Sequence, residues 1–148
     1  MILFLDFDGV LHTDPCHKED ELFRHVPLFE SVMADFPDVE IVISSTWAKN
    51  RDWPIIIRPF SPDVAERIIG KTPDHQTFER ALDFELYHRH AEVLEWLRQA
   101  GRSGEKWVAL DDRHDWFKPL LPNLVRCESS TGMTPDVASV LRRKLREN

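Results

Sequence analysis

Three short motifs of the sequence end an apolar run in acidic or hydroxyl side chains. These side chains are Asp6 and Asp8 in LDFDG, Ser44 in IVISS, and Asp111 and Asp112 in ALDD. Two unit charges about 4 Å apart repel by roughly 1 kcal/mol in water, and by several times more at the lower effective dielectric constant of a cleft. Carboxylates that converge in one place therefore need a cation among them, and hard oxygen ligands favour Mg²⁺.

A neutral hydroxyl beside such a metal indicates what the site binds. Ser44 would face a group other than the metal, and a phosphoryl oxygen is the natural candidate. When a cation neutralises part of the phosphate charge, one aspartate can act as a nucleophile and form an aspartyl phosphate. The motifs therefore point to phosphoryl-transfer chemistry.

The apolar runs before these motifs are typical of buried strands in a parallel sheet, because they lack the alternation of a half-exposed strand. We expect strands at residues 2–5, 39–43, 67–71, 107–110 and 124–127. We expect helices at about 27–37, a short one from about 62, and longer ones from about 89 to 101 and from 134 onward, according to their caps, prolines and apolar spacing. This alternation predicts one domain over residues 1–148. Its fold class is α/β, a three-layer sandwich around a five-stranded parallel Rossmann-like sheet without a large cap domain. The working groups of such a fold collect at the carboxyl ends of the strands.

The motifs also resemble a known family. DFDGV at 6–10, IVISS at 41–45 and LDD at 110–112 resemble the signature motifs of the haloacid dehalogenase (HAD) superfamily, in the chain order of that family. VISSTW at 42–47, IIGKTP at 68–73 and RHAEVLEWL at 89–97 are similar to the HAD-type domain associated with RNA-repair proteins. The resemblance implies a Mg²⁺-dependent phosphatase, that is, a phosphoric monoester hydrolase with an aspartyl-phosphate intermediate.

The resemblance also implies a role for each motif residue. Asp6 would be the nucleophile and a metal ligand. Asp8 would protonate the leaving oxygen and then activate water, while its backbone carbonyl reaches the metal. Ser44 would hold the transferring phosphoryl group. Asp111, together with Asp112, would complete the Mg²⁺ shell directly or through water.

Two assignments stay open at the level of the sequence. The basic residue that neutralises the nucleophile and the phosphate is Arg89 or Lys71, and the context RHAEVLEWL and the planar fork of arginine favour Arg89. Asp115 lies four residues after Asp111, a spacing that the family also uses for a metal ligand, but it is equally compatible with a solvated turn.

The substrate is constrained only in outline. Neither insertion point between the motifs holds enough residues for a large lid, so the resemblance implies a bulky phosphorylated substrate, such as a nucleic-acid end or a phosphoprotein, or a lid from a partner subunit in an oligomer. We expect residues 72–87 to line the entrance. The formal net charge of -7 argues against a broad nucleic-acid surface. The alternative function is a non-hydrolytic phosphoacceptor or binding module with the same acidic Mg²⁺ site.

Composition gives the expected compartment. The two cysteines, Cys16 and Cys127, lie far apart, and neither a secretory leader nor a run of roughly 20 apolar residues is evident. We therefore expect a cytoplasmic protein without a membrane partner. The seven histidines lack the paired spacing of a zinc finger, so they are expected at the surface or satisfied by neighbours.

Overall fold

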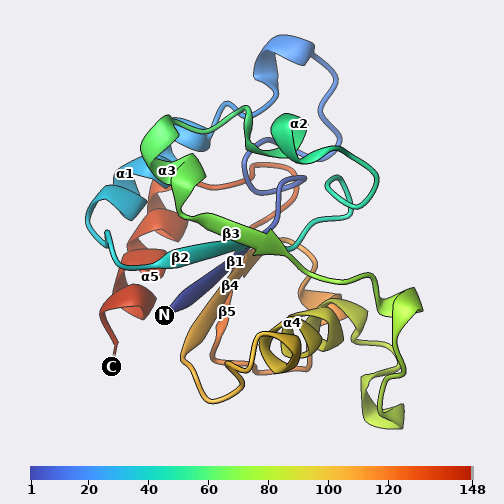
Figure 1. The fold of residues 1–148 in the computed structure, drawn as a ribbon. Helices are drawn as coiled ribbons and strands as arrows, with labels where there is room; N and C mark the ends of the chain where they lie inside the picture. The colour runs from blue at the N-terminus through green and yellow to red at the C-terminus, as the bar shows by residue number, and fades with distance from the viewer. Residues whose placement is uncertain (148) are drawn as a thin grey trace.

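The computed structural model describes residues 1–147 and contains a five-stranded sheet in which every paired strand is parallel. The strands are β1 (Ile2–Leu5), β2 (Glu40–Ile43), β3 (Ile68–Lys71), β4 (Trp107–Asp111) and β5 (Leu124–Arg126). Their order across the sheet is β3-β2-β1-β4-β5, so β1 is central (Figure 1). All five expected strands are confirmed, and each bound differs from the expected one by a single residue at most.

The central strand is buried on both faces, which explains its unbroken apolar sequence. Leu3 and Leu5 belong to the larger apolar cluster, on one face of the sheet. Ile2 and Phe4 belong to the smaller cluster, on the other face. This division follows from the alternation of side chains along a strand.

Helices cover both faces of the sheet, as expected of a three-layer α/β sandwich (Figure 1). The helices are α1 (Val26–Ala34), α2 (Trp53–Ile57), α3 (Pro62–Glu66), α4 (His88–Gln99) and α5 (Pro135–Arg146). Helices α1 and α5 contribute Phe29 and Leu141 to the larger cluster, whereas α4 contributes Val93 and Leu97 to the smaller one. The α/β fold predicted from the sequence is therefore confirmed.

The helix ends follow the signals in the sequence. The hydroxyls of Ser61 and Thr134 accept hydrogen bonds from backbone N–H groups three residues later, at 3.4 and 3.2 Å, at the start of α3 and α5. Gly101, at φ +69°, ends α4, where the N–H of Arg102 donates to the carbonyl of Leu97 at 2.8 Å. Helix α2, with the sequence WPIII, was not expected, because its three consecutive β-branched residues, Ile55–Ile57, favour a strand.

Loops at the carboxyl ends of the strands replace a cap domain. Within residues 1–147 the connection from β3 to α4 contains only two short 3₁₀ helices, His75–Thr77 and Leu82–Phe84, and no large cap domain. Both of them pack against α4. No helix within the described residues is long and apolar enough to cross a membrane.

Candidate active site

Three buried carboxylates meet at the carboxyl edge of the sheet. Asp6 directly follows β1, Asp111 is the last residue of β4, and Asp112 comes next. Strands β1 and β4 are paired in parallel, with Leu5 opposite Leu110, so both chains leave the sheet at the same edge. One oxygen from each carboxylate lies within 4.8 Å of the other two, and each residue is at most 9 % exposed.

Gly9 allows this convergence. Its φ of +76° is rarely adopted by residues with a side chain, and it lets the chain turn back after Asp8. A Cβ atom at this position would lie only 2.1 Å from Oδ2 of Asp112. The glycine in the DFDG motif is therefore required both by the turn and by the close approach of the Asp112 carboxylate.

The guanidinium of Arg89, from the first turn of α4, lies against this cluster and is 2 % exposed. Its Nη1 lies 2.9 Å from Oδ2 of Asp111 and 3.4 Å from Oδ1 of Asp6. Nη1 also donates to the backbone carbonyl of Ser44 at 3.0 Å, and Nη2 donates to Oγ1 of Thr46 at 3.0 Å. Burial by itself would lower the pKa of Arg89, but the charges of Asp111 and Asp6 outweigh it and raise that pKa. Arg89 therefore remains a cation.

Lys71, the other basic candidate, lies elsewhere. It ends β3, which is an outer strand of the sheet, and its side chain is exposed. Its Nζ donates to the backbone carbonyl of Ala48 at 3.3 Å. Of the two candidates, the one that contacts the carboxylates is Arg89.

The carboxylate cluster carries more negative charge than Arg89 compensates. Burial, followed by the charge of Asp111, raises the pKa of Asp6 well above its usual value, and Arg89 opposes this only in part. Burial also raises the pKa of Asp112. The donor set consists of oxygen atoms alone, which suits a hard divalent cation. The residues present therefore fit Mg²⁺, and Asp6, Asp111 and Asp112 are the side chains that would hold it.

Ser44 lies beside the same edge and has a free hydroxyl. The residue is 1 % exposed, and its backbone N–H donates to the carbonyl of Leu5 at 2.8 Å. Its Oγ is buried without a hydrogen-bond partner among the described residues. Because an unpaired buried hydroxyl costs about 1–3 kcal/mol, this atom indicates a polar ligand at the site.

Asp8 lies next to the cluster, but its carboxylate is not part of the metal-type group formed by the other three aspartates. Its side chain is 42 % exposed, and Oδ1 lies 2.7 Å from Nε2 of His12. From the sequence, His12 was expected only at the surface or satisfied by neighbours, like the other histidines, and not at the site. The available signal was its spacing, four residues after Asp8 in DGVLH.

Asp115 does not join the carboxylates. Its side chain is 56 % exposed and forms an ion pair with Arg113, at 3.1 Å. The pairing with Arg113 lowers the pKa of Asp115. The geometry thus agrees with the solvated-turn interpretation of this residue.

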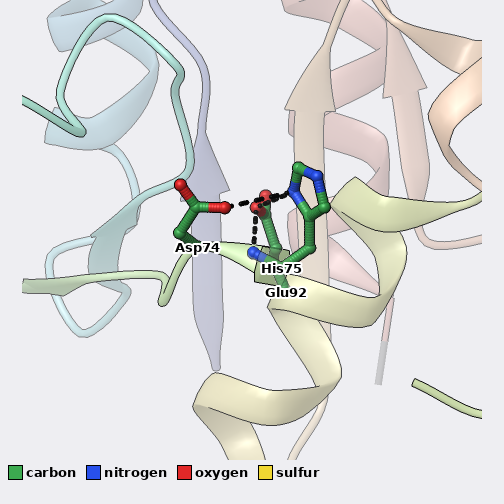
Figure 2. A group of neighbouring side chains, drawn as sticks. All are labelled: Asp74, His75 and Glu92. Carbon is green, nitrogen blue, oxygen red and sulfur yellow. Dashed lines mark hydrogen bonds and ion pairs between the residues drawn. The ribbon is translucent and has the colours of Figure 1, made fainter. Parts of the chain in front are cut away.

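A second group of ligand-type side chains consists of Asp74, His75 and Glu92 (Figure 2). Asp74 and His75 come from the connection after β3, and Glu92 comes from α4. The Nζ atom of Lys49 lies 2.7 Å from Oε2 of Glu92 and 3.5 Å from Oδ1 of Asp74. The single ammonium group of Lys49 thus offsets part of the negative charge of the two carboxylates.

Glu92 joins this group to the candidate site at the carboxyl edge of the sheet. It accepts hydrogen bonds from the backbone N–H and from Nδ1 of His75, each at 2.9 Å (Figure 2). Its other oxygen lies 3.7 Å from Nε of Arg89. The sequence contained no local signal for these contacts. They fix the start of the 72–87 connection relative to Arg89.

Aromatic contacts extend this connection to the loop after β4. The ring of His75 lies 4.3 Å from that of His88, which lies 4.2 Å from that of Trp116. Burial, followed by the charge of His75, lowers the pKa of His88 to about 4. The 72–87 connection therefore reaches the side of the site where α4 begins.

The parallel sheet, its order and the aspartates at its carboxyl edge define the chain as a HAD-like α/β protein. Residues 2–138 match the family described as the HAD domain in Swiss Army Knife RNA repair proteins, and the chain belongs to that family. Searches of curated proteins and of solved structures find no match to it.

Proposed function

We propose that this protein is a Mg²⁺-dependent phosphomonoesterase that forms an aspartyl phosphate on Asp6. The observation that carries the proposal is the buried group of Asp6, Asp111 and Asp112 beside a buried arginine and an unpaired serine hydroxyl. Family membership supports phosphoesterase-type chemistry. Sites with a purely structural role rarely contain an unpaired buried hydroxyl together with several buried carboxylates whose negative charge is only partly compensated.

The residues divide the reaction into two displacements. In the first, an oxygen of Asp6 attacks phosphorus and the bond to the leaving oxygen breaks, while Asp8 gives that oxygen a proton. In the second, Asp8 takes a proton from water as the water oxygen attacks phosphorus, and the bond between phosphorus and Asp6 breaks to release phosphate. Bound Mg²⁺ would neutralise charge on the phosphoryl oxygens.

Arg89 and Ser44 have supporting roles in this scheme. Arg89, 3.4 Å from Asp6, keeps the nucleophile oriented and partly compensated. The Ser44 hydroxyl donates to a phosphoryl oxygen, which satisfies the group that is otherwise unpaired. We assign Arg89, and not Lys71, as the basic residue of the site because only Arg89 contacts Asp6 and Asp111.

The experiment that tests this function is hydrolysis of an aryl phosphate by the purified protein. We expect activity that EDTA abolishes and Mg²⁺ restores, and we expect none from Asp6→Asn. Beryllium fluoride or mass spectrometry should place the adduct on Asp6. An adduct on Ser44, or full activity in metal-free buffer, contradicts the mechanism. A phosphorylated Asp6 that persists without turnover indicates the alternative function, a phosphoacceptor module.

For the substrate we propose a polynucleotide end. The family description supports it, as does the absence of a large cap domain from residues 1–147. A panel of 3′- and 5′-phosphorylated oligonucleotides, phosphopeptides, nucleotides and sugar phosphates tests this choice by kcat/KM. The choice is wrong if sugar phosphates exceed every macromolecule by orders of magnitude.

A further inference from the structure

His12 is a buried histidine beside the proposed site to which the reaction above gives no role. It is 1 % exposed, although it lies in the loop between β1 and α1. Its Nε2 lies 2.7 Å from Oδ1 of Asp8, and its Nδ1 accepts the backbone N–H of Phe23 at 3.2 Å. Both ring nitrogens are therefore committed to neighbours.

These two contacts determine where the ring proton lies. A backbone N–H can only donate, so the Nδ1 atom that accepts it carries no proton. The proton of the neutral ring is then on Nε2, which donates it to Asp8. The arrangement makes His12 a donor to the carboxylate and leaves it no free nitrogen with which to exchange protons.

The ring of His12 is packed against other side chains and is not exposed to solvent. Phe23 packs edge-on against His12, with ring centroids 5.0 Å apart. Phe23 in turn packs against Phe7 and Trp47, at 5.6 and 5.5 Å. Phe23 itself has a φ of +59°, a conformation that non-glycine residues rarely adopt and that aims its N–H at the histidine. The His12 ring, which is the donor to Asp8, is therefore packed against a group of aromatic side chains.

Asp8, by contrast, has a side chain that is 42 % exposed and would sample several rotamers without a partner. We propose that His12 is a positioning residue for Asp8. Its Nε2–H holds one carboxylate oxygen and leaves the second oxygen for proton transfer. This inference rests on the proposed role of Asp8 as the acid and base of the reaction. His12 keeps its own proton in both displacements.

The test uses two substitutions and a matched control. His12→Phe keeps an aromatic ring but removes the donor, whereas His12→Gln keeps an N–H donor close to the position of Nε2. His25→Phe is the control, since His25 lies in the same loop and its Nε2 bonds the backbone carbonyl of Thr131 at 2.9 Å without touching Asp8. Circular dichroism and thermal unfolding establish that each variant is folded.

We expect His12→Phe to lower kcat about 10- to 100-fold for phosphates with poor leaving groups, with KM nearly unchanged, because misplacement by about 1 Å costs this much. With an activated aryl phosphate, the variant should still release a burst of the leaving group, but steady turnover should be slow because phosphate stays on Asp6. His12→Gln should recover most of the loss, and His25→Phe should show none.

Three results would overturn the inference while leaving the proposed function in place. In the first, folded His12→Phe has the wild-type kcat while Asp8→Asn is impaired, so the proposed function stands and the role of His12 does not. In the second, His12→Gln loses as much as His12→Phe. In the third, ¹⁵N NMR of the wild-type protein places the ring proton on Nδ1, a readout independent of activity. If Asp8→Asn turns over normally, the role of Asp8 fails and the inference fails with it.

Discussion

Replacing Arg89 with methionine removes the cation that lies between three buried carboxylates. Its guanidinium is 2.9 Å from Asp111, 3.4 Å from Asp6 and 3.7 Å from Glu92. Breaking a buried ion pair by removing one partner costs about 3–5 kcal/mol, because the remaining charge stays buried without compensation. For a chain of this length 1 kcal/mol corresponds to about 3–4 °C in Tm, so we expect Tm to fall by about 10–20 °C.

The loss of stability in Arg89→Met should depend on pH, and the structure gives the direction of this dependence. Burial and the charge of Asp111 already raise the pKa of Asp6, and Arg89 is the group that lowers it. Without Arg89 that pKa rises further. When the pKa of a carboxyl group is higher in the folded state than in the unfolded state, the folded protein becomes less stable as pH increases, because the group ionises more readily in the unfolded state. The deficit of Arg89→Met should therefore be larger at pH 8 than at pH 5.

The assay is thermal unfolding followed by far-UV circular dichroism in EDTA, at pH 5 and pH 8. Arg89→Lys should be intermediate, because an ammonium group keeps the charge but cannot bridge Asp111, the Ser44 carbonyl and Thr46 as the planar fork does. Lys71→Met is the control and should stay within about 0.5 kcal/mol of the wild type. A Tm for Arg89→Met within about 2 °C of the wild type, or a larger deficit at pH 5, would refute the reasoning.

Three further outcomes are expected from single substitutions. Asp6→Asn should raise Tm in EDTA at pH 8 and lose that advantage toward pH 4, since the amide removes a carboxyl whose pKa is raised by burial; an unchanged Tm at pH 8 contradicts this. Gly9→Ala should unfold at a lower temperature and lose activity with it, because the new Cβ would lie 2.1 Å from Asp112; wild-type Tm and kcat would show that the turn tolerates a side chain. Burial, followed by the charge of Lys118, lowers the pKa of His90 to about 4, so urea unfolding should show stability falling as pH drops from about 6.5 to 4. His90→Phe should flatten that fall, and parallel pH profiles would count against the assignment.

The strands and the convergence of the acidic motifs could be predicted from the sequence, because their signals are local. An unbroken apolar run such as Ile2–Leu5 indicates a strand covered on both faces. Once the strands are parallel, the aspartates that follow β1 and β4 must leave the sheet at one edge. The bounds of β2 differ from the expected ones by one residue, within the usual uncertainty of strand ends.

The short helix α2 could not be predicted, since local preference and tertiary context disagree there. Three consecutive isoleucines, Ile55–Ile57, favour a strand by their branching at Cβ. In the structure Ile56 is buried in the larger apolar cluster, and Pro54 lies in the first turn, where a missing N–H costs nothing. Burial of one face therefore outweighs the local preference.

The sequence by itself determined which residue types meet at the candidate site, because motif order and strand period carry that information along the chain. Only the tertiary structure shows that Arg89, and not Lys71, contacts the carboxylates of the candidate site, a choice that the sequence left open. Lys71 ends an outer strand in solvent, whereas α4 lays the Arg89 side chain against the central strand. The contacts of His12 with Asp8 and Phe23 were likewise decided by the fold, as was the pairing of Lys49 with Glu92 across 43 residues. Hydrogen bonds and ion pairs act over about 3 Å, and such distances between remote segments are set by how the whole chain packs.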